Sequence, residues 1–116
     1  MCPQGPFAQQ PGFQPKYEVG QLIQHRRYAY RGVIAALDAS CIADDDWYLS
    51  NQTQPDRDQP WYHVIVHGSH HTTYVAEENV EVDHGGEQVV NPLARELFEF
   101  FHRGRYQPRQ DAVFRI

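Results

Sequence analysis

The sequence predicts a mostly β protein, a small barrel of about five short strands followed by one C-terminal α-helix. Two observations predict this fold class. The apolar segments between residues 17 and 82 are short and are separated by clusters of turn-forming residues, without the strand–helix alternation of a parallel sheet. Only one segment, which begins at Asn91, repeats its apolar residues with a helical period.

The chain has 116 residues, of which 41% are hydrophobic, and this size suits one domain with one core. Residues 1–15 hold four prolines and no charged side chain, so we expect a disordered N-terminal tail. The domain is expected over residues 16–106, with a C-terminal tail over residues 107–116. No apolar run approaches the roughly 20 residues of a membrane span, and no secretory signal is visible. We therefore expect a cytoplasmic protein with no membrane partner.

The first two strands are expected around two apolar segments near the start of the domain. Leu22 and Ile23 begin the first strand. Gly32 marks a bulge or a close backbone approach at the start of the second strand. The following run, VIAAL over residues 33–37, is mostly apolar and therefore predicts a strand that is covered on both faces.

The segment PWYHVIVHG, residues 60–68, is the clearest strand pattern in the chain. Side chains alternate between the two faces of a strand, so we expect one face to belong to the core and the other to be able to line a groove. The core face holds Tyr62, Val64 and Val66, and the other face holds Trp61, His63, Ile65 and His67. The bend GSHHT then leads into TTYVAEENVEV, which predicts a fourth strand, a short turn and a fifth strand.

Residues 43–60 form a polar, turn-rich segment that is too long for a simple hairpin turn. Loops of this length are usually functional or disordered, and we expect Trp47 and Tyr48 to pin part of it to the domain.

The C-terminal helix has clear start and stop signals. Asn91 is a good N-cap and Pro92 suits the first helical position. Leu93, Leu97 and Phe100 or Phe101 then recur at helical spacing until Gly104, which supplies a stop. Such an apolar helix is expected to pack on the sheet or on another subunit, and the tail after it is expected to be extended.

The titratable residues do not assemble into a recognisable catalytic or metal motif, so we expect no enzyme, no metal and no cofactor. His63 and His67 lie about 13 Å apart on a regular strand and cannot share one metal. The histidines of the following bend and the acidic run over residues 44–46 are typical of solvated loops. Cys2 and Cys41 are too few for a disulfide framework, and both are expected to be free thiols.

The basic residues carry more information. Nine of the ten are arginine, and the segment HRRYAYR, residues 25–31, interleaves them with tyrosines. Arginine beside aromatic rings can bind phosphates and stack on bases, although an ordinary polar loop whose tyrosines reach the core fits the spacing equally well. The net charge of −5 argues against strong nonspecific binding to nucleic acid, which is driven by phosphate neutralisation.

Three ordered blocks of the sequence resemble one known family. They are KYEVGQLIQHRRYAYRGVIAALD (residues 16–38), DQPWYHVIVHG (58–68) and TYVAEENVE (73–81). Together they resemble the YccV-like, hemimethylated-DNA-binding domain, which includes the heat-shock protein branch HspQ and also occurs in some eukaryotic F-box proteins. The resemblance implies an SH3-like β-barrel with a non-enzymatic role. The first turn, the long loop and the longer C-terminal segment depart from the HspQ branch and are closer to the F-box-associated versions.

The resemblance and the residues together favour a DNA-binding module. Its partner is expected to be a DNA duplex, including one in hemimethylated form. Tyr28, Tyr30 and Trp47 could then form an apolar pocket for a methyl group in the major groove. The residues expected to contact DNA are His25, Arg26, Arg27, Tyr28, Tyr30, Arg31 and Arg57. The alternative is a protein-interaction adaptor, such as an HspQ-like modulator of degradation by a protease. Its partner-binding residues would be Trp47, Trp61, His63 and Phe100.

Overall fold

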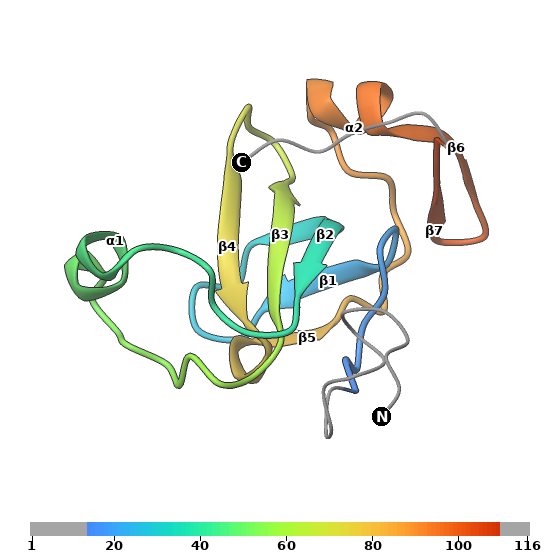
Figure 1. Cartoon of the computed structure of the whole chain (residues 1–116). Helices are drawn as coiled ribbons and strands as arrows, with labels where there is room; N and C mark the ends of the chain where they lie inside the picture. The colour runs from blue at the N-terminus through green and yellow to red at the C-terminus, as the bar shows by residue number, and fades with distance from the viewer. Residues whose placement is uncertain (1–13, 110–116) are drawn as a thin grey trace.

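The computed structural model describes residues 14–109 and shows a mostly β protein, as the sequence predicts (Figure 1). Most of the two expected tails, residues 1–13 and 110–116, lies outside the described residues, and so does Cys2. In chain order the elements are β1 (Leu22–His25), β2 (Arg31–Asp38), α1 (Asp45–Ser50), β3 (Trp61–Val66), β4 (Thr72–Ala76), the 3-10 helix η1 (Glu77–Asn79), β5 (Val80–Val82), α2 (Pro92–Leu97), β6 (Phe98–His102) and β7 (Arg105–Pro108).

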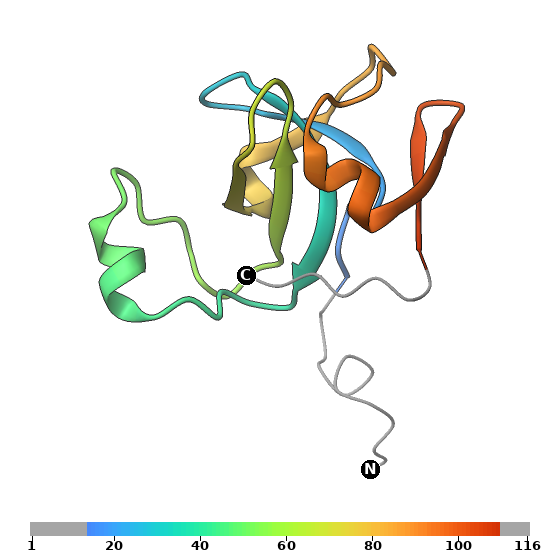
Figure 2. The ribbon, with the colours of Figure 1, turned by 90° about the horizontal axis from the view of Figure 1, so that it is seen from above.

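The main sheet has five strands in the order β4-β3-β2-β1-β5, and every neighbouring pair is antiparallel. It curls, as the view from above shows (Figure 2). The two edge strands, β4 and β5, do not pair with each other, so within the described residues the sheet is not closed into the predicted barrel. A second, two-stranded sheet is formed by β6 and β7.

The centre of the main sheet is covered on both faces, as the apolar run in β2 predicts. Gly32 permits this packing, because a Cβ atom at that position would lie 2.4 Å from Val64 Cγ1 and 2.6 Å from the Ile65 carbonyl oxygen. The close backbone approach predicted at Gly32 is therefore confirmed. A register shift between Ile34 and Ala36 bends β2 and contributes to the curl.

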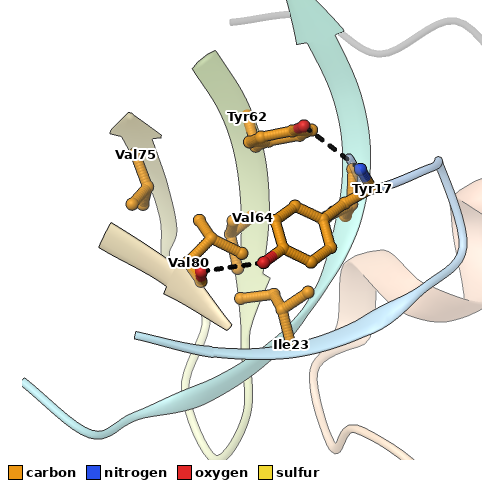
Figure 3. Close-up of a cluster of buried hydrophobic side chains, with 7 residues drawn as sticks. Tyr17, Ile23, Tyr62, Val64, Val75 and Val80 are labelled. Carbon is orange, nitrogen blue, oxygen red and sulfur yellow. Dashed lines mark hydrogen bonds between the residues drawn. The ribbon is translucent and has the colours of Figure 1, made fainter. Parts of the chain in front are cut away.

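The inner face of the curl holds the first core cluster, which includes the predicted core residues Tyr62 and Val64 (Figure 3). Tyr17 closes this cluster from the N-terminal side, and its hydroxyl donates a hydrogen bond to the Val80 carbonyl oxygen. The outer face carries a second cluster, in which Leu22, Val33 and Ile65 pack against residues from α2 and the β6–β7 hairpin. These C-terminal elements and α1 lie at opposite ends of the molecule (Figures 1 and 2).

The C-terminal helix is shorter than the sequence predicts. Asn91 caps it by accepting a hydrogen bond from the Leu93 amide, but α2 ends at Leu97 and the predicted second half is the strand β6. Arg103 and Gly104 both have positive φ angles, which form the tight turn that folds β7 back on β6. Gly104 therefore ends a strand of a hairpin and does not end a helix.

The loop over residues 43–60 contains the short helix α1, which the sequence did not predict. Its N-cap is Asp44, whose side chain accepts a hydrogen bond from the Trp47 amide. Tyr48 packs against a third cluster formed by Trp61, Ala76 and the free, buried Cys41, so the loop is pinned to the domain as expected. No helix within residues 14–109 is long and apolar enough to cross a membrane.

Candidate functional site

A groove of about 440 Å³ lies between the β1–β2 turn, the α1 segment and strands β3 and β4. It is referred to below as the aromatic groove. None of its lining residues carries a carboxylate, lysine or arginine side chain. The lining residues are His25, Tyr28, Tyr30, Trp47, Asn51, Gln52, Thr53, Pro55, Trp61, His63, Thr72, Thr73, Tyr74, Val75, Ala76 and Asn79.

The first wall of the aromatic groove is the β1–β2 turn, which is organised by His25. The His25 Nδ1 atom accepts hydrogen bonds from the backbone amides of Arg27 and Tyr28, each at 3.0 Å. Its ring lies 4.7 Å from the Tyr28 ring and 5.1 Å from the Tyr30 ring, measured between centroids. Ala29 adopts a positive φ of 62° to close the turn. The turn therefore presents its aromatic side chains in a fixed arrangement.

The opposite wall is an aromatic cluster on β3, β4 and α1. The Tyr74 ring lies 5.2 Å from Trp61 and 5.7 Å from Trp47, measured between centroids. His63 stacks on Tyr74 at 4.4 Å, and Asp38 Oδ2 lies 3.0 Å from His63 Nε2 and 2.7 Å from the Tyr74 hydroxyl. Burial, followed by the hydrogen bond to Asp38, raises the pKa of Tyr74 above its usual value. Its hydroxyl therefore stays protonated and holds the wall in place.

Two hydrogen bonds join the walls. The Tyr28 hydroxyl donates to Gln52 Oε1 at 3.3 Å, and the Tyr30 hydroxyl lies 2.7 Å from Thr73 Oγ1. Burial raises the pKa of Tyr30, so this hydroxyl is also protonated at neutral pH. The result is a groove of ring faces, amides and hydroxyls, which can stack planar groups and form hydrogen bonds with them.

The structure brings together residues from both hypotheses. His25, Tyr28 and Tyr30 belong to the predicted DNA-binding set, whereas Trp47, Trp61 and His63 belong to the alternative set, yet all six line the aromatic groove. Phe100 does not, because it lies on β6 beside a different cavity under the C-terminal hairpin. Phe100 therefore does not line the groove with the other three residues of the alternative set.

The predicted arginines have different environments. Arg31 forms an ion pair with Asp83 at 2.8 Å and donates to the Glu87 carbonyl oxygen, and Arg57 binds the Ala43 carbonyl oxygen and Asp45. Their guanidinium groups hold the structure together and do not line the groove. Arg26 is exposed; its Nη1 atom lies 3.6 Å from Glu81 Oε1 and its Nε atom donates to the Val80 carbonyl oxygen at 3.2 Å.

Arg27 is exposed at the tip of the same turn. Within residues 14–109, its guanidinium takes part in none of the ion pairs or side-chain hydrogen bonds of the fold. Arg26 and Arg27 are therefore the two arginines of the predicted set that are most available to a ligand.

Several lining residues were not predicted as site residues. Tyr74 is the most central of them, and its only sequence signal is its place in the TYVAEEN block. It reaches the groove because it pairs with His63 across the β3–β4 ladder, and that register depends on the geometry of the intervening turn. Asn79 belongs to the same block, whereas Asn51 and Gln52 come from a segment without a repeating pattern, so no sequence signal marks them.

Acidification is expected to destabilise the turn through His25. Burial, with the nearby Arg27 charge as a smaller cause, lowers the pKa of His25 below its usual 6.5. The unfolded chain therefore binds this proton more readily, so stability is present above about pH 6.5 and is lost as the pH falls toward the lower folded pKa. Protonation at Nδ1 also removes the acceptor of two backbone amides.

The measurement is urea unfolding at about pH 7 and at about pH 5. The matched variant is His25→Asn, because an asparagine side chain can accept hydrogen bonds from nearby amides and does not titrate. The wild type should lose more free energy of unfolding between the two pH values than the variant does. Parallel losses in the two proteins would show that His25 is not the titrating group.

The chain matches one family model and is similar to curated proteins from several mammals. The family model described as "Hemimethylated DNA-binding protein YccV like" matches residues 15–105. Curated relatives include F-box only protein 21 from Homo sapiens, Pongo abelii and Mus musculus, each 26% identical over 102 residues. The alignment covers 85% of this chain and 16% of each relative, so the chain spans about a sixth of the length of these proteins.

Proposed function

The chain belongs to the YccV-like family of hemimethylated-DNA-binding proteins, and on this premise we propose that it is a non-catalytic DNA-binding module that docks on a duplex through its β1–β2 turn. The observation that carries the proposal is the position of Arg26 and Arg27, which are exposed on a rigid turn beside the aromatic groove. Phosphate contacts from such arginines position a protein on DNA without reading its sequence.

In this proposal the aromatic groove recognises the methyl group of a hemimethylated duplex. A hemimethylated site differs from an unmethylated one by a single methyl group in the major groove, so its recognition needs apolar surface next to the phosphate contacts. Tyr28 is 52% exposed and Trp47 is 38% exposed, and with Tyr30 they offer this surface at the mouth of the groove. We assign methyl recognition to these three rings.

We also propose that the curled sheet is a partly open version of the SH3-like barrel that the sequence resemblance implies. Two features support this: η1 lies between β4 and β5, and β5 returns to pair with β1, the first strand of the sheet. The proposed docking turn then lies at one end of the curl, where it projects beyond the sheet.

The salt dependence of duplex binding tests the proposal. Two phosphate contacts give a slope of about −1.8 in the plot of log affinity against log salt, so a fourfold increase in salt should weaken binding roughly tenfold. The measurement is a fluorescence anisotropy titration of a labelled duplex over a series of salt concentrations. The proposal would be overturned if the protein bound no duplex even at low salt. A much steeper slope would mean that DNA contacts a larger number of basic residues than this turn provides.

A further inference from the structure

The strand β4 is an edge of the main sheet, and part of its outer side is open. The Val66 amide donates to the His71 carbonyl oxygen and the Glu77 amide donates to the Pro60 carbonyl oxygen, which fixes the hydrogen-bonding register of the β3–β4 pair. In that register Thr73 and Val75 direct their backbone groups toward β3. The amide and carbonyl groups of Thr72 and Tyr74 point away from the sheet, and no other strand in residues 14–109 pairs with them.

The aromatic groove runs along this open edge. Successive side chains of a strand lie on opposite faces, so a cavity over one face would be lined by every second residue. All five residues of β4 line the groove, and they are joined there by Tyr30 from one face and by Trp61 from the other. Only a cavity that follows the edge itself can contact both faces. Because the sheet curls without closing, the groove occupies the seam that β4 leaves open.

We propose that this seam is a docking site for an extended peptide segment of a partner protein, which adds to β4 as a further strand. Backbone groups of the segment would pair with those of Thr72 and Tyr74, and alternate side chains would enter the groove on either side of the edge. This interaction goes beyond the proposed binding of DNA, since it uses the backbone of β4 and does not need the arginines of the turn, although both proposals use the Trp47 ring.

The charges on the α1 side of the groove favour a segment that places a lysine or arginine there, whereas Arg26 and Arg27 flank the β1–β2 wall. The α1 wall begins with three exposed acidic residues, 44–46, of which Asp45 is paired with Arg57. Trp47 follows them and offers an exposed ring to the groove, and a cation over such a ring is attracted by its π face. The net charge of the whole chain, −5, acts in the same direction. An acidic segment would meet repulsion on this wall.

A matched pair of variants at Thr72 tests the proposal. Thr72→Pro removes an outward amide at the first residue of β4, a position where proline does not interrupt the ladder with β3. Thr72→Val keeps the amide. The probe is a displayed library of short random peptides, selected on the full chain, and the best peptide is then titrated against both variants. Selected peptides should be rich in lysine or arginine and should bind the proline variant about fivefold more weakly than the valine variant.

Amide hydrogen exchange locates the peptide. In the free chain the amides of Thr72 and Tyr74 should exchange quickly while those of Thr73 and Val75 are protected, and the peptide should slow exchange at Thr72 and Tyr74 at least about tenfold. The proposal is overturned if no peptide is selected, if the two variants bind the peptide equally, or if the slowed amides lie elsewhere.

Two other occupants of the seam would also overturn it. Sedimentation that shows a dimer of the wild type, lost in Thr72→Pro alone, would assign the edge to a second copy of this chain. Weaker binding of a DNA duplex by Thr72→Pro than by Thr72→Val would assign the seam to DNA. An absence of any duplex binding in all three proteins would contradict the proposed function and leave the peptide result standing.

Discussion

Replacement of Gly20 by alanine is expected to destabilise the fold by about 3 kcal/mol, enough to lower the melting temperature by roughly 15 °C. Gly20 has a φ of +92°, which alanine rarely adopts, and an added Cβ atom would lie 2.1 Å from the Tyr106 carbonyl oxygen. The same glycine donates to the Ile34 carbonyl oxygen and accepts from the Tyr106 amide, so it attaches the C-terminal hairpin to the main sheet.

Gly86→Ala is the matched control. Gly86 also has a positive φ, 72°, but a Cβ atom there meets no other atom within 4 Å. The free energy of unfolding of this variant should therefore fall by only about 1 kcal/mol, which is the cost of the positive φ without a steric clash. Thermal and urea unfolding of the two variants give the comparison. Equal losses would show that the hairpin does not approach the sheet at Gly20 as closely as the structure indicates.

Replacement of Arg26 and Arg27 together by glutamine is expected to weaken duplex binding about 30-fold at low salt and to remove most of its salt dependence. The reason is that each lost phosphate contact costs about 1 kcal/mol and reduces the salt slope by about one. The measurement is the same anisotropy titration, made for the variant over the same range of salt.

Arg95→Gln is the control for this experiment. Arg95 is exposed on α2, at the opposite end of the molecule from α1 (Figure 1), so its loss changes the net charge without touching the turn. Its affinity for the duplex should stay close to that of the wild type. A similar weakening in both proteins would mean that DNA responds to overall charge and that the turn has no special role. The single variant Arg27→Gln measures the contribution of Arg27 to duplex binding by itself. Arg26 differs from it because it also donates to the Val80 carbonyl oxygen.

Much of the sheet could be predicted because its signals are local. Residues 60–68 alternate between two faces and end at a glycine, and the structure places β3 there. The same signals did not distinguish helix from strand at Phe98–His102, since its closely spaced apolar residues fit either period. Phe98–His102 forms a strand because it pairs with Arg105–Pro108, and this pairing is a tertiary contact that a local pattern does not show. In α1 the acidic run over residues 44–46 indicated a solvated loop, because six helical residues are too few to show a helical period.

The aromatic groove could be predicted only in pieces. The segment HRRYAYR indicated one wall, and Trp47, Trp61 and His63 indicated the other. A shared pocket of Tyr28, Tyr30 and Trp47 was a hypothesis that followed from DNA binding, because nothing local joins the two walls. Their meeting depends on the curl of the sheet and on strand register, which arise from contacts between residues far apart in the chain. For the same reason the sequence could not distinguish Arg27, which is free, from Arg31, which pairs with Asp83 across 52 positions.

The most direct test of the central claim is a titration of the wild-type chain with three duplexes of one sequence that are unmethylated, hemimethylated and fully methylated. At low salt we expect saturable binding to all three. Burial of one methyl group against the rings at the mouth of the groove contributes about 0.8 kcal/mol, so the hemimethylated duplex should bind about fourfold more tightly than the unmethylated one. Absence of saturable binding to any of the duplexes would contradict the claim that this chain is a DNA-binding module.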